Sequence, residues 1–335
     1  MLIWLGNMVG NSFDSMKKLT YKEAFFKTPG PRDFKGGILL WSKGICMGGA
    51  DIIPGVSGGT IAFITGIYTQ LIDAIRSFDL NFARRVISLD FREALALVHV
   101  RFLFCLLFGI LTAIICMASV MHFMLSSFPV EIWSLFFGLI VASIYVVGRE
   151  IQYLKIQSIG FVFAGCFCSY FLVGMIPVST PETMPFIFFC GAIAICAMIL
   201  PGISGAFLLL LLGKYEYITG MLKNPFVADH LLVLVVFATG AVAGILFFSR
   251  VIHYLLHRWH SATICMLTGF MLGALRKVWP WKETLESIVI REKIHILREQ
   301  NVLPALDEQF FIALGLAIAG AVTVLLLDRL SRGGR

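Results

Sequence analysis

The chain has 335 residues, of which 59% are hydrophobic and only 14% are charged, and its formal net charge is +7. Soluble domains carry about 25% charged residues, so this composition excludes an ordinary soluble protein and predicts a membrane protein. The positive charge does not require a nucleic-acid partner, because the basic cytoplasmic loops of membrane proteins explain it more simply. We therefore expect a membrane protein with no nucleic-acid partner.

The first 35 residues differ from the rest of the chain. They lack the basic region and the small-residue cleavage site of a secretory signal. Basic and aromatic side chains alternate here, among them Lys17, Phe25 and Arg32. We expect 1–35 to form a cytoplasmic arm or an interfacial helix lying on the membrane surface.

Six plain apolar runs indicate membrane-spanning helices. They cover 102–125, 132–148, 159–176, 231–249, 262–280 and 310–327. Most reach the roughly 17–25 residues that a spanning helix needs. No strand-like alternation is apparent, which argues against an outer-membrane barrel. The expected fold class is therefore an all-α polytopic membrane protein.

One motif occurs twice. The segment DIIPGVSGGTIAFITGIY at 51–68 aligns with MILPGISGAFLLLLLGKY at 198–215, a shift of 147 residues. Pro54, Gly55, Ser57, Gly58, Gly66 and Tyr68 fall on Pro201, Gly202, Ser204, Gly205, Gly213 and Tyr215. Later matches follow a shift of 131, as in Gly138 and Gly269. The repeat predicts two homologous halves, 36–178 and 183–330.

Each half begins with a broken apolar segment, 38–75 in the first and 185–222 in the second. A single helix over 38–75 would be about 57 Å long, far beyond a membrane core of roughly 30 Å. A break at Pro54 leaves a first leg of only about 24 Å. We therefore expect a re-entrant helical hairpin followed by three transmembrane helices in each half; two short spans are the alternative.

A hairpin plus three spans is an odd number of crossings, so the second half must be an inverted structural repeat of the first. This topology places both termini, 76–101, 149–155 and 250–260 on the cytoplasmic side, with most of the 27 Lys and Arg. The outer loops 126–131 and 177–184 then carry none, as the positive-inside rule prefers. The loop 276–308 is the exception, because it is outside yet holds as many basic as acidic residues.

The broken segments are the candidate binding site. Irregular backbone at membrane depth is tolerated where it lines a cavity, and matching interruptions in two halves indicate a transporter's site. N–H groups and hydroxyls at a helix start suit a phosphate or carboxylate. The candidate substrate-binding residues are Pro54, Gly55, Ser57, Gly58, Gly59, Thr60, Pro201, Gly202, Ser204 and Gly205, with Lys43 at the cytoplasmic mouth. Close helix packing is the alternative for the motifs, and snorkelling is the alternative for Lys43.

Lys43 and Asp51 break the symmetry of the repeat, because their counterparts are the apolar Cys190 and Met198. Charges inside a membrane are functional candidates. Burial would favour the neutral form of Asp51, which makes it a candidate to bind a coupling proton or Na⁺. The alternative is that Asp51 only caps N–H groups of the hairpin tip.

Other polar and reactive residues carry weaker signals. All eight cysteines lie in apolar segments without a CxxC pair, which is typical of small membrane hydrophobes. Arg149, Arg250 and Arg276 lie near helix ends as anchors, and the repeat-related His122 and His253 lie near the interfaces. We expect no catalytic residues, no metal site and no cofactor beyond a coupling H⁺ or Na⁺.

The segment KGICMGGADIIPGVSGGTIAFITGIY resembles the signature of the bacterial polyprenyl-phosphate (undecaprenyl-phosphate) transporter family. The resemblance covers nearly the whole chain, and the paired PGVSGG and PGISGA motifs are specific. It implies a flippase in the bacterial cytoplasmic membrane that returns the phosphate head of the C55 lipid carrier to the inner leaflet. Cell-envelope glycan synthesis then reuses that lipid. The second copy departs from the first at Ala206 and Phe207, which replace Gly59 and Thr60.

The physical chemistry of the lipid agrees with that implication. A phosphomonoester cannot cross hydrocarbon alone because of its charge, whereas its prenyl tail can stay in lipid. We expect the transport to be coupled to an ion gradient; a homo-oligomer is compatible with the sequence. The alternatives are a small-anion channel or exchanger and, less favoured, a membrane enzyme acting on a lipid phosphate.

Overall fold

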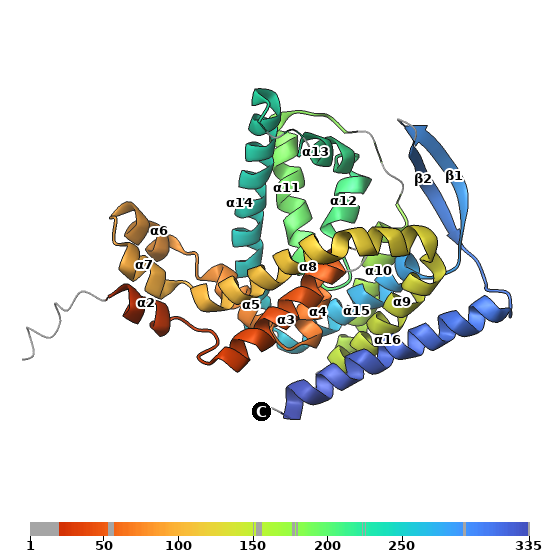
Figure 1. Cartoon of the computed structure of the whole chain (residues 1–335), viewed down its shortest axis with the longest axis horizontal. Coiled ribbons are helices and arrows are strands. Elements are labelled where there is room, and N and C mark those ends of the chain that lie inside the picture. The colour runs from red at the N-terminus through yellow and green to blue at the C-terminus, as the bar shows by residue number, and fades with distance from the viewer. Residues whose placement is uncertain are drawn as a thin grey trace, which may run out of the picture.

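The computed structural model describes most of the chain and is mostly helical (79%) (Figure 1). The described residues are 20–52, 57–149, 151, 156–175, 178, 180–222, 224, 226–290 and 293–333. The arm and the first half contain α2 (Tyr21–Lys27), α3 (Phe34–Asp51), α4 (Gly58–Ile64), α5 (Tyr68–Arg76), α6 (Leu80–Ile87), α7 (Phe91–Leu97), α8 (Val100–Ser127), α9 (Pro129–Gly148) and α10 (Ile156–Val173). The second half contains α11 (Met184–Ile199), α12 (Gly205–Leu211), α13 (Tyr215–Met221), α14 (Ala228–Arg258), α15 (His260–Val278), β1 (Lys282–Ile290), β2 (Lys293–Asn301) and α16 (Glu308–Gly333).

Within the described residues, four helices are long and apolar enough to cross a membrane. The qualifying segments are Val100–Met117 in α8, Pro129–Gly148 in α9, Ala228–Arg258 in α14 and Glu308–Arg329 in α16. The other two expected spans, 159–176 and 262–280, do not meet that criterion by themselves. The apolar part of α10 is too short, and α15 carries Arg276 and Lys277 in its last turn, which makes it less apolar. Helix α15 packs on both α9 and α10.

Corresponding helices of the two halves pack in corresponding pairs. Helix α3 packs on α8, and α11 packs on α14. Both pairs cross at a glycine. A Cβ at Gly44 would lie 2.4 Å from the carbonyl oxygen of Leu106, and a Cβ at Gly191 would lie 2.2 Å from that of Phe237. The two contacts are related by the shifts of 147 and 131 residues seen in the sequence.

The same correspondence holds for the remaining spans. Helix α9 packs on α16, and α10 packs on α15. A Cβ at Gly165 would lie 2.3 Å from the carbonyl oxygen of Met266, and a Cβ at Gly320 would lie 2.2 Å from that of Leu135. Small residues let helices approach this closely in membranes. The glycines of the repeat therefore set equivalent helix crossings in the two halves.

The segment after each motif is broken a second time, which the sequence analysis did not predict. The chain turns at Gly66, just after α4, and at Gly213, just after α12, with φ angles of 70° and 64°. The N–H of Ile67 then donates to the carbonyl of Ala62, and the N–H of Lys214 donates to that of Leu209. Glycine adopts this left-handed conformation without strain and so ends the helix. Each predicted second leg is therefore two short helices, α4–α5 and α12–α13.

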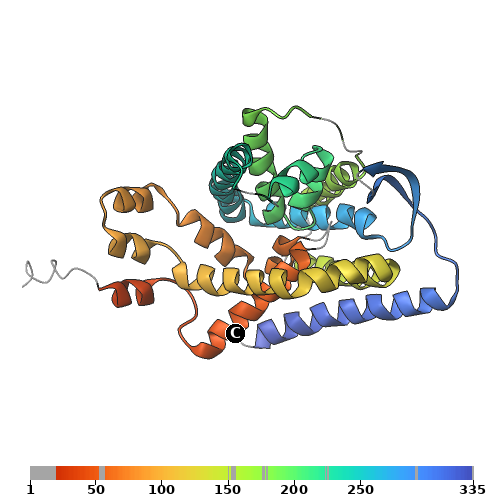
Figure 2. The ribbon, with the colours of Figure 1, turned by 45° about the horizontal axis from the view of Figure 1, so that its top comes forward.

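The expected all-α fold is wrong in one region, because 276–308 is not an irregular loop. Strands β1 and β2 pair antiparallel there, at the end of the molecule away from the arm (Figure 2). The ammonium groups of Lys277 and Lys282 lie 3.3 and 3.6 Å from one carboxylate oxygen of Glu299, on β2. Charged residues occur along both strands, and the sequence analysis interpreted the whole segment as a loop.

The segment 79–97, part of the loop 76–101 that the sequence analysis placed on the cytoplasmic side, is largely helical. It forms α6 and α7, and the apolar side chains Leu80 and Ile87 are 75% and 81% exposed. Helix α2 of the arm packs against α7, where the guanidinium of Arg92 lies 4.7 Å from the ring centre of Tyr21. Helices α2 and α6 therefore both pack against α7.

Segments that the topology places on the same side of the membrane lie next to each other. On the expected cytoplasmic side, Arg250 donates to the carbonyl of Phe78 at 3.2 Å, and Arg149 is paired with Asp328. On the expected outer side, Gln309 donates to Glu131 at 3.3 Å. These contacts agree with the predicted grouping of the loops.

Candidate functional site

The two copies of the motif meet in the structure. The hydroxyl of Ser57 donates to the carbonyl of Met198 at 2.9 Å. The N–H of Gly202 donates to the hydroxyl oxygen of Thr60 at 3.0 Å. These residues are more than 140 positions apart in the chain, so tertiary packing alone brings them together. Pro54 and Gly55 lie outside the described residues.

Each motif serine begins a short helix. Ser57 caps α4 and accepts from the N–H of Gly59 at 3.1 Å. Ser204 caps α12 and accepts from the N–H of Phe207 at 3.4 Å. Ser, unlike an apolar residue, satisfies a helix's first N–H groups in this way. The repeated serine therefore starts a helix in both halves.

The end of α3 is tied to the start of α4 by Asp51. The N–H of Gly58 donates to the Asp51 carboxylate at 2.7 Å. A Cβ at Gly58 would lie 2.5 Å from the second carboxylate oxygen, so a larger residue there would displace this carboxylate. This is the contact that the capping interpretation of Asp51 predicts.

The polar groups predicted to face an anion bind one another in this arrangement. Ser57 and Thr60 are 1% and 2% exposed, and the hydrogen bonds described above use their hydroxyl oxygens. Pro201 and Gly205 are also buried, the latter against the carbonyl of Ala194. The structure brings the predicted residues of both motifs together in a closed form, in which an anion would have to replace protein acceptors.

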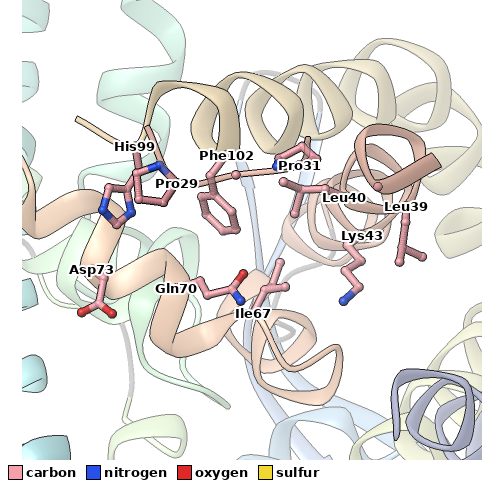
Figure 3. A pocket seen from close by; sticks show the side chains of 12 residues that line it. Pro29, Pro31, Leu39, Leu40, Lys43, Ile67, Gln70, Asp73, His99 and Phe102 are labelled. Carbon is pink, nitrogen blue, oxygen red and sulfur yellow. The ribbon is translucent and has the colours of Figure 1, made fainter. Parts of the chain in front are cut away.

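Lys43 is not part of that contact and lines a separate pocket of about 480 Å³ between α3, α5 and the start of α8 (Figure 3). Its ammonium donates to the carbonyl of Thr65 at 2.8 Å, which joins the two legs of the first broken segment. The walls near it are apolar, from Leu39, Leu40 and Phe102. A cation beside an apolar wall can hold an amphiphile with an anionic head.

The far wall of the pocket carries other titratable groups. Asp73 and His99 line it. The ring nitrogen Nδ1 of His253, on α14, lies 2.9 Å from a carboxylate oxygen of Asp73. Arg76 lies 2.6 Å from the other ring nitrogen of His253. Sequence analysis had treated His253 only as an interfacial residue. It bridges α5 of the first half to α14 of the second.

Sequence analysis gave no role to Lys214, although the structure buries it. Its side chain is 3% exposed, and its ammonium donates to the carbonyl of Thr180 at 2.7 Å. The signal available in the sequence was a lone lysine next to the repeated glycine that ends α12. Among the residues that the structure describes, no group of three or more His, Cys, Asp or Glu could hold a metal ion.

Comparison with known proteins identifies relatives over most of the chain. Residues 47–296 match the family described as "Undecaprenyl phosphate translocase-like". A "Polyprenyl-phosphate transporter" of Vibrio cholerae is 40% identical over 300 residues, which are 87% of this chain and 96% of that protein. A protein of the same name from Staphylococcus aureus is 28% identical over 255 residues, 71% of this chain and 84% of the relative. No solved structure matches the chain.

Proposed function

Because the chain belongs to the undecaprenyl phosphate translocase-like family, we propose that it is a polyprenyl-phosphate transporter of the bacterial cytoplasmic membrane. It moves the phosphate head of undecaprenyl phosphate from the outer to the inner leaflet, where cell-envelope glycan synthesis reuses the lipid. Two features of this chain support the proposal beyond the family: the contact between the motifs and the pocket at Lys43.

The contact between the two motif copies carries the proposal. In transporters built from inverted repeats, the substrate site lies where broken helices of the two halves meet. Here Ser57 bonds to Met198 and Thr60 to Gly202, which joins the break of one half to the break of the other. The architecture we propose is therefore two inverted repeats, 36–178 and 183–330, with hairpins at 38–75 and 185–222 that enter from opposite sides.

The helix contacts support this architecture. Equivalent glycines make equivalent crossings in both halves, as in Gly44 and Gly191. The ammonium of Lys43 on α3 reaches the carbonyl of Thr65 at the end of α4, so the two legs of the first hairpin lie side by side. In this architecture the termini, 76–101, 149–155 and 250–260 are cytoplasmic.

The phosphate head passes between the halves while the prenyl tail stays in lipid. The N–H and hydroxyl groups of the two motifs then bind phosphate oxygens in place of the protein acceptors they hold in the closed form. These groups belong to Ser57, Gly58, Gly59 and Thr60 in the first motif and to Gly202, Ser204 and Gly205 in the second. Pro201 lies at the break of the second half. Exchange of one acceptor for another keeps every buried donor paired, which lowers the cost of opening the contact.

Asp51 couples the movement to an ion gradient in this proposal. Its carboxylate lies beside the phosphate donors and repels an anion unless a proton or Na⁺ neutralises it. Binding of the cation and binding of the phosphate then strengthen each other to the same degree. The hydrogen bond from Gly58 to Asp51 places the carboxylate next to the motif, where such coupling would act.

Purified protein in vesicles tests the function. Undecaprenyl phosphate is placed in the outer leaflet, and its appearance in the inner leaflet is followed together with chloride flux and phosphate release. The proposal predicts movement of the lipid without the other two signals. Chloride flux without lipid movement would indicate an anion channel or exchanger, and released phosphate would indicate an enzyme.

A further inference from the structure

The ammonium group of Lys214 is buried, and its surroundings compensate its positive charge only weakly. It lies at the start of α13, donates to the carbonyl of Thr180 at 2.7 Å, and lies 5.6 Å from the ring centre of Tyr217. The nearest carboxylate oxygen, on Glu182, is 3.9 Å away, and that side chain is 60% exposed. A buried ammonium whose counter-charge is this distant and solvent-exposed is only weakly compensated, which makes Lys214 a functional candidate.

Lys214 takes the place of Lys43 once the two halves are compared in space. Under the shift of 147 residues, Lys43 corresponds to Cys190 and Lys214 corresponds to Ile67. Lys43 and Ile67 line the same pocket in the first half. Cys190 lies within electrostatic reach of Lys214 in the second half. Each half therefore has one lysine at this pair of positions, supplied by opposite legs.

The local contacts of the two lysines are also alike. Each donates to a backbone carbonyl, Lys43 to Thr65 and Lys214 to Thr180. An ammonium carries three donors, so a carbonyl at this distance leaves room for further acceptors. The first hairpin has Lys43 where the second has Cys190. The second hairpin instead carries Lys214 on its other leg, so each hairpin supplies one lysine.

The surroundings of Lys214 place it on the side opposite to Lys43. Its carbonyl partner belongs to 177–184, an outer loop in the proposed topology that contains no Lys or Arg. Lys43 belongs to the leg that enters from the cytoplasmic side. In the proposed topology, the half-buried Lys43 and the buried Lys214 therefore lie on opposite sides of the contact between Ser57 and Met198.

We propose that Lys214 is the external counterpart of Lys43 and binds the phosphate head of the lipid on the outer side, before the head reaches the motifs. This inference rests on the proposed function, because it assigns the outer entry point of the same pathway. A lipid phosphomonoester is the ligand class that suits this cation, because its phosphate supplies a counter-charge while its prenyl tail stays in lipid.

Paired substitutions test it in reconstituted vesicles with farnesyl phosphate added outside as the probe. Lys214→Met should raise KM for uptake about tenfold or more with little change in kcat, since one charge-assisted contact is lost. The double variant Cys190→Lys with Lys214→Ile copies the arrangement of the first half and should restore KM. The exposed Lys27→Met removes one charge elsewhere and should leave KM unchanged.

Two results would overturn the inference. One is a folded Lys214→Met protein with the wild-type KM; the other is a folded double variant as weak as Lys214→Met, which would mean that Lys214 acts only by tethering Thr180. Titration calorimetry of farnesyl phosphate with the same purified variants separates the two proposals. Wild-type binding without uptake refutes transport but still tests Lys214 by affinity, and no binding by the wild type refutes both.

Discussion

Alanine at Gly59 should force the two copies of the motif apart. Its Cβ would lie 2.5 Å from the carbonyl oxygen of Ile199 and 2.8 Å from that of Met198. Both are backbone atoms, so neither can swing away as a side chain could. Ordinary contact begins at about 3.4 Å, so the backbones must separate by about 0.9 Å, the difference between 3.4 and 2.5 Å.

The cost can be estimated from the contacts that this separation strains. The hydrogen bond from Ser57 to Met198, now 2.9 Å, would lengthen beyond a useful distance. Loss of one buried hydrogen bond costs about 1 kcal/mol, and overpacking a closely packed site costs about 1–3 kcal/mol. We therefore expect Gly59→Ala to destabilise the closed form by about 2–4 kcal/mol.

Gly49 on α3 provides a matched control. A Cβ there would lie 3.6 Å from the terminal methyl of Met117, an ordinary contact with a flexible side chain. Thermal unfolding in detergent and lipid uptake in vesicles are measured for both variants. Gly59→Ala should lose stability and transport, whereas Gly49→Ala should match the wild type or gain slightly, because alanine favours helix. Equal behaviour of the two variants would refute the reasoning.

Three further predictions use single substitutions. Asp51→Asn, which mimics the neutral carboxyl, should keep phosphate binding but lose the response of transport to pH and Na⁺; an unchanged response would leave Asp51 as a cap for Gly58 only. Thr60→Val removes the acceptor of the Gly202 N–H and should cost about 1–3 kcal/mol in unfolding free energy, and a variant as stable as the wild type would contradict that bond. Burial, with Glu299 opposing it, lowers the pKa of Lys282 to about 8 from its ordinary 10.5. Between these two pH values the unfolded chain therefore keeps a proton at Lys282 that the folded chain has lost. The stability of the wild type relative to Lys282→Met should thus rise with pH from 8 to 10.5. A constant difference would show that Lys282 titrates normally.

Sequence alone determined the features that depend on local pattern. The long apolar runs of α8, α9, α14 and α16 reveal their nature within one segment, because the bilayer imposes a length and a composition on each spanning helix. The repeat was visible as well, since Pro54 and Pro201 stand in register. The break after Asp51 also followed from local chemistry, because glycine and proline do not continue a helix.

Features that combine distant residues required the tertiary structure. The partners of Ser57 and Thr60 lie in the other half of the chain, so the sequence could name the donors but not the acceptors that occupy them in the closed form. Strands β1 and β2 escaped detection because their pairing, rather than an apolar alternation, defines them.

Lys43 and Lys214 illustrate the difference best. In the sequence, Lys43 stands opposite Cys190, and the repeat looks asymmetric. In the fold, Lys214 lies on the other leg of its hairpin and within electrostatic reach of Cys190. Alignment compares positions along a chain, whereas electrostatic energy depends on where charges lie in space, so only the packing of the legs could reveal a lysine near Cys190.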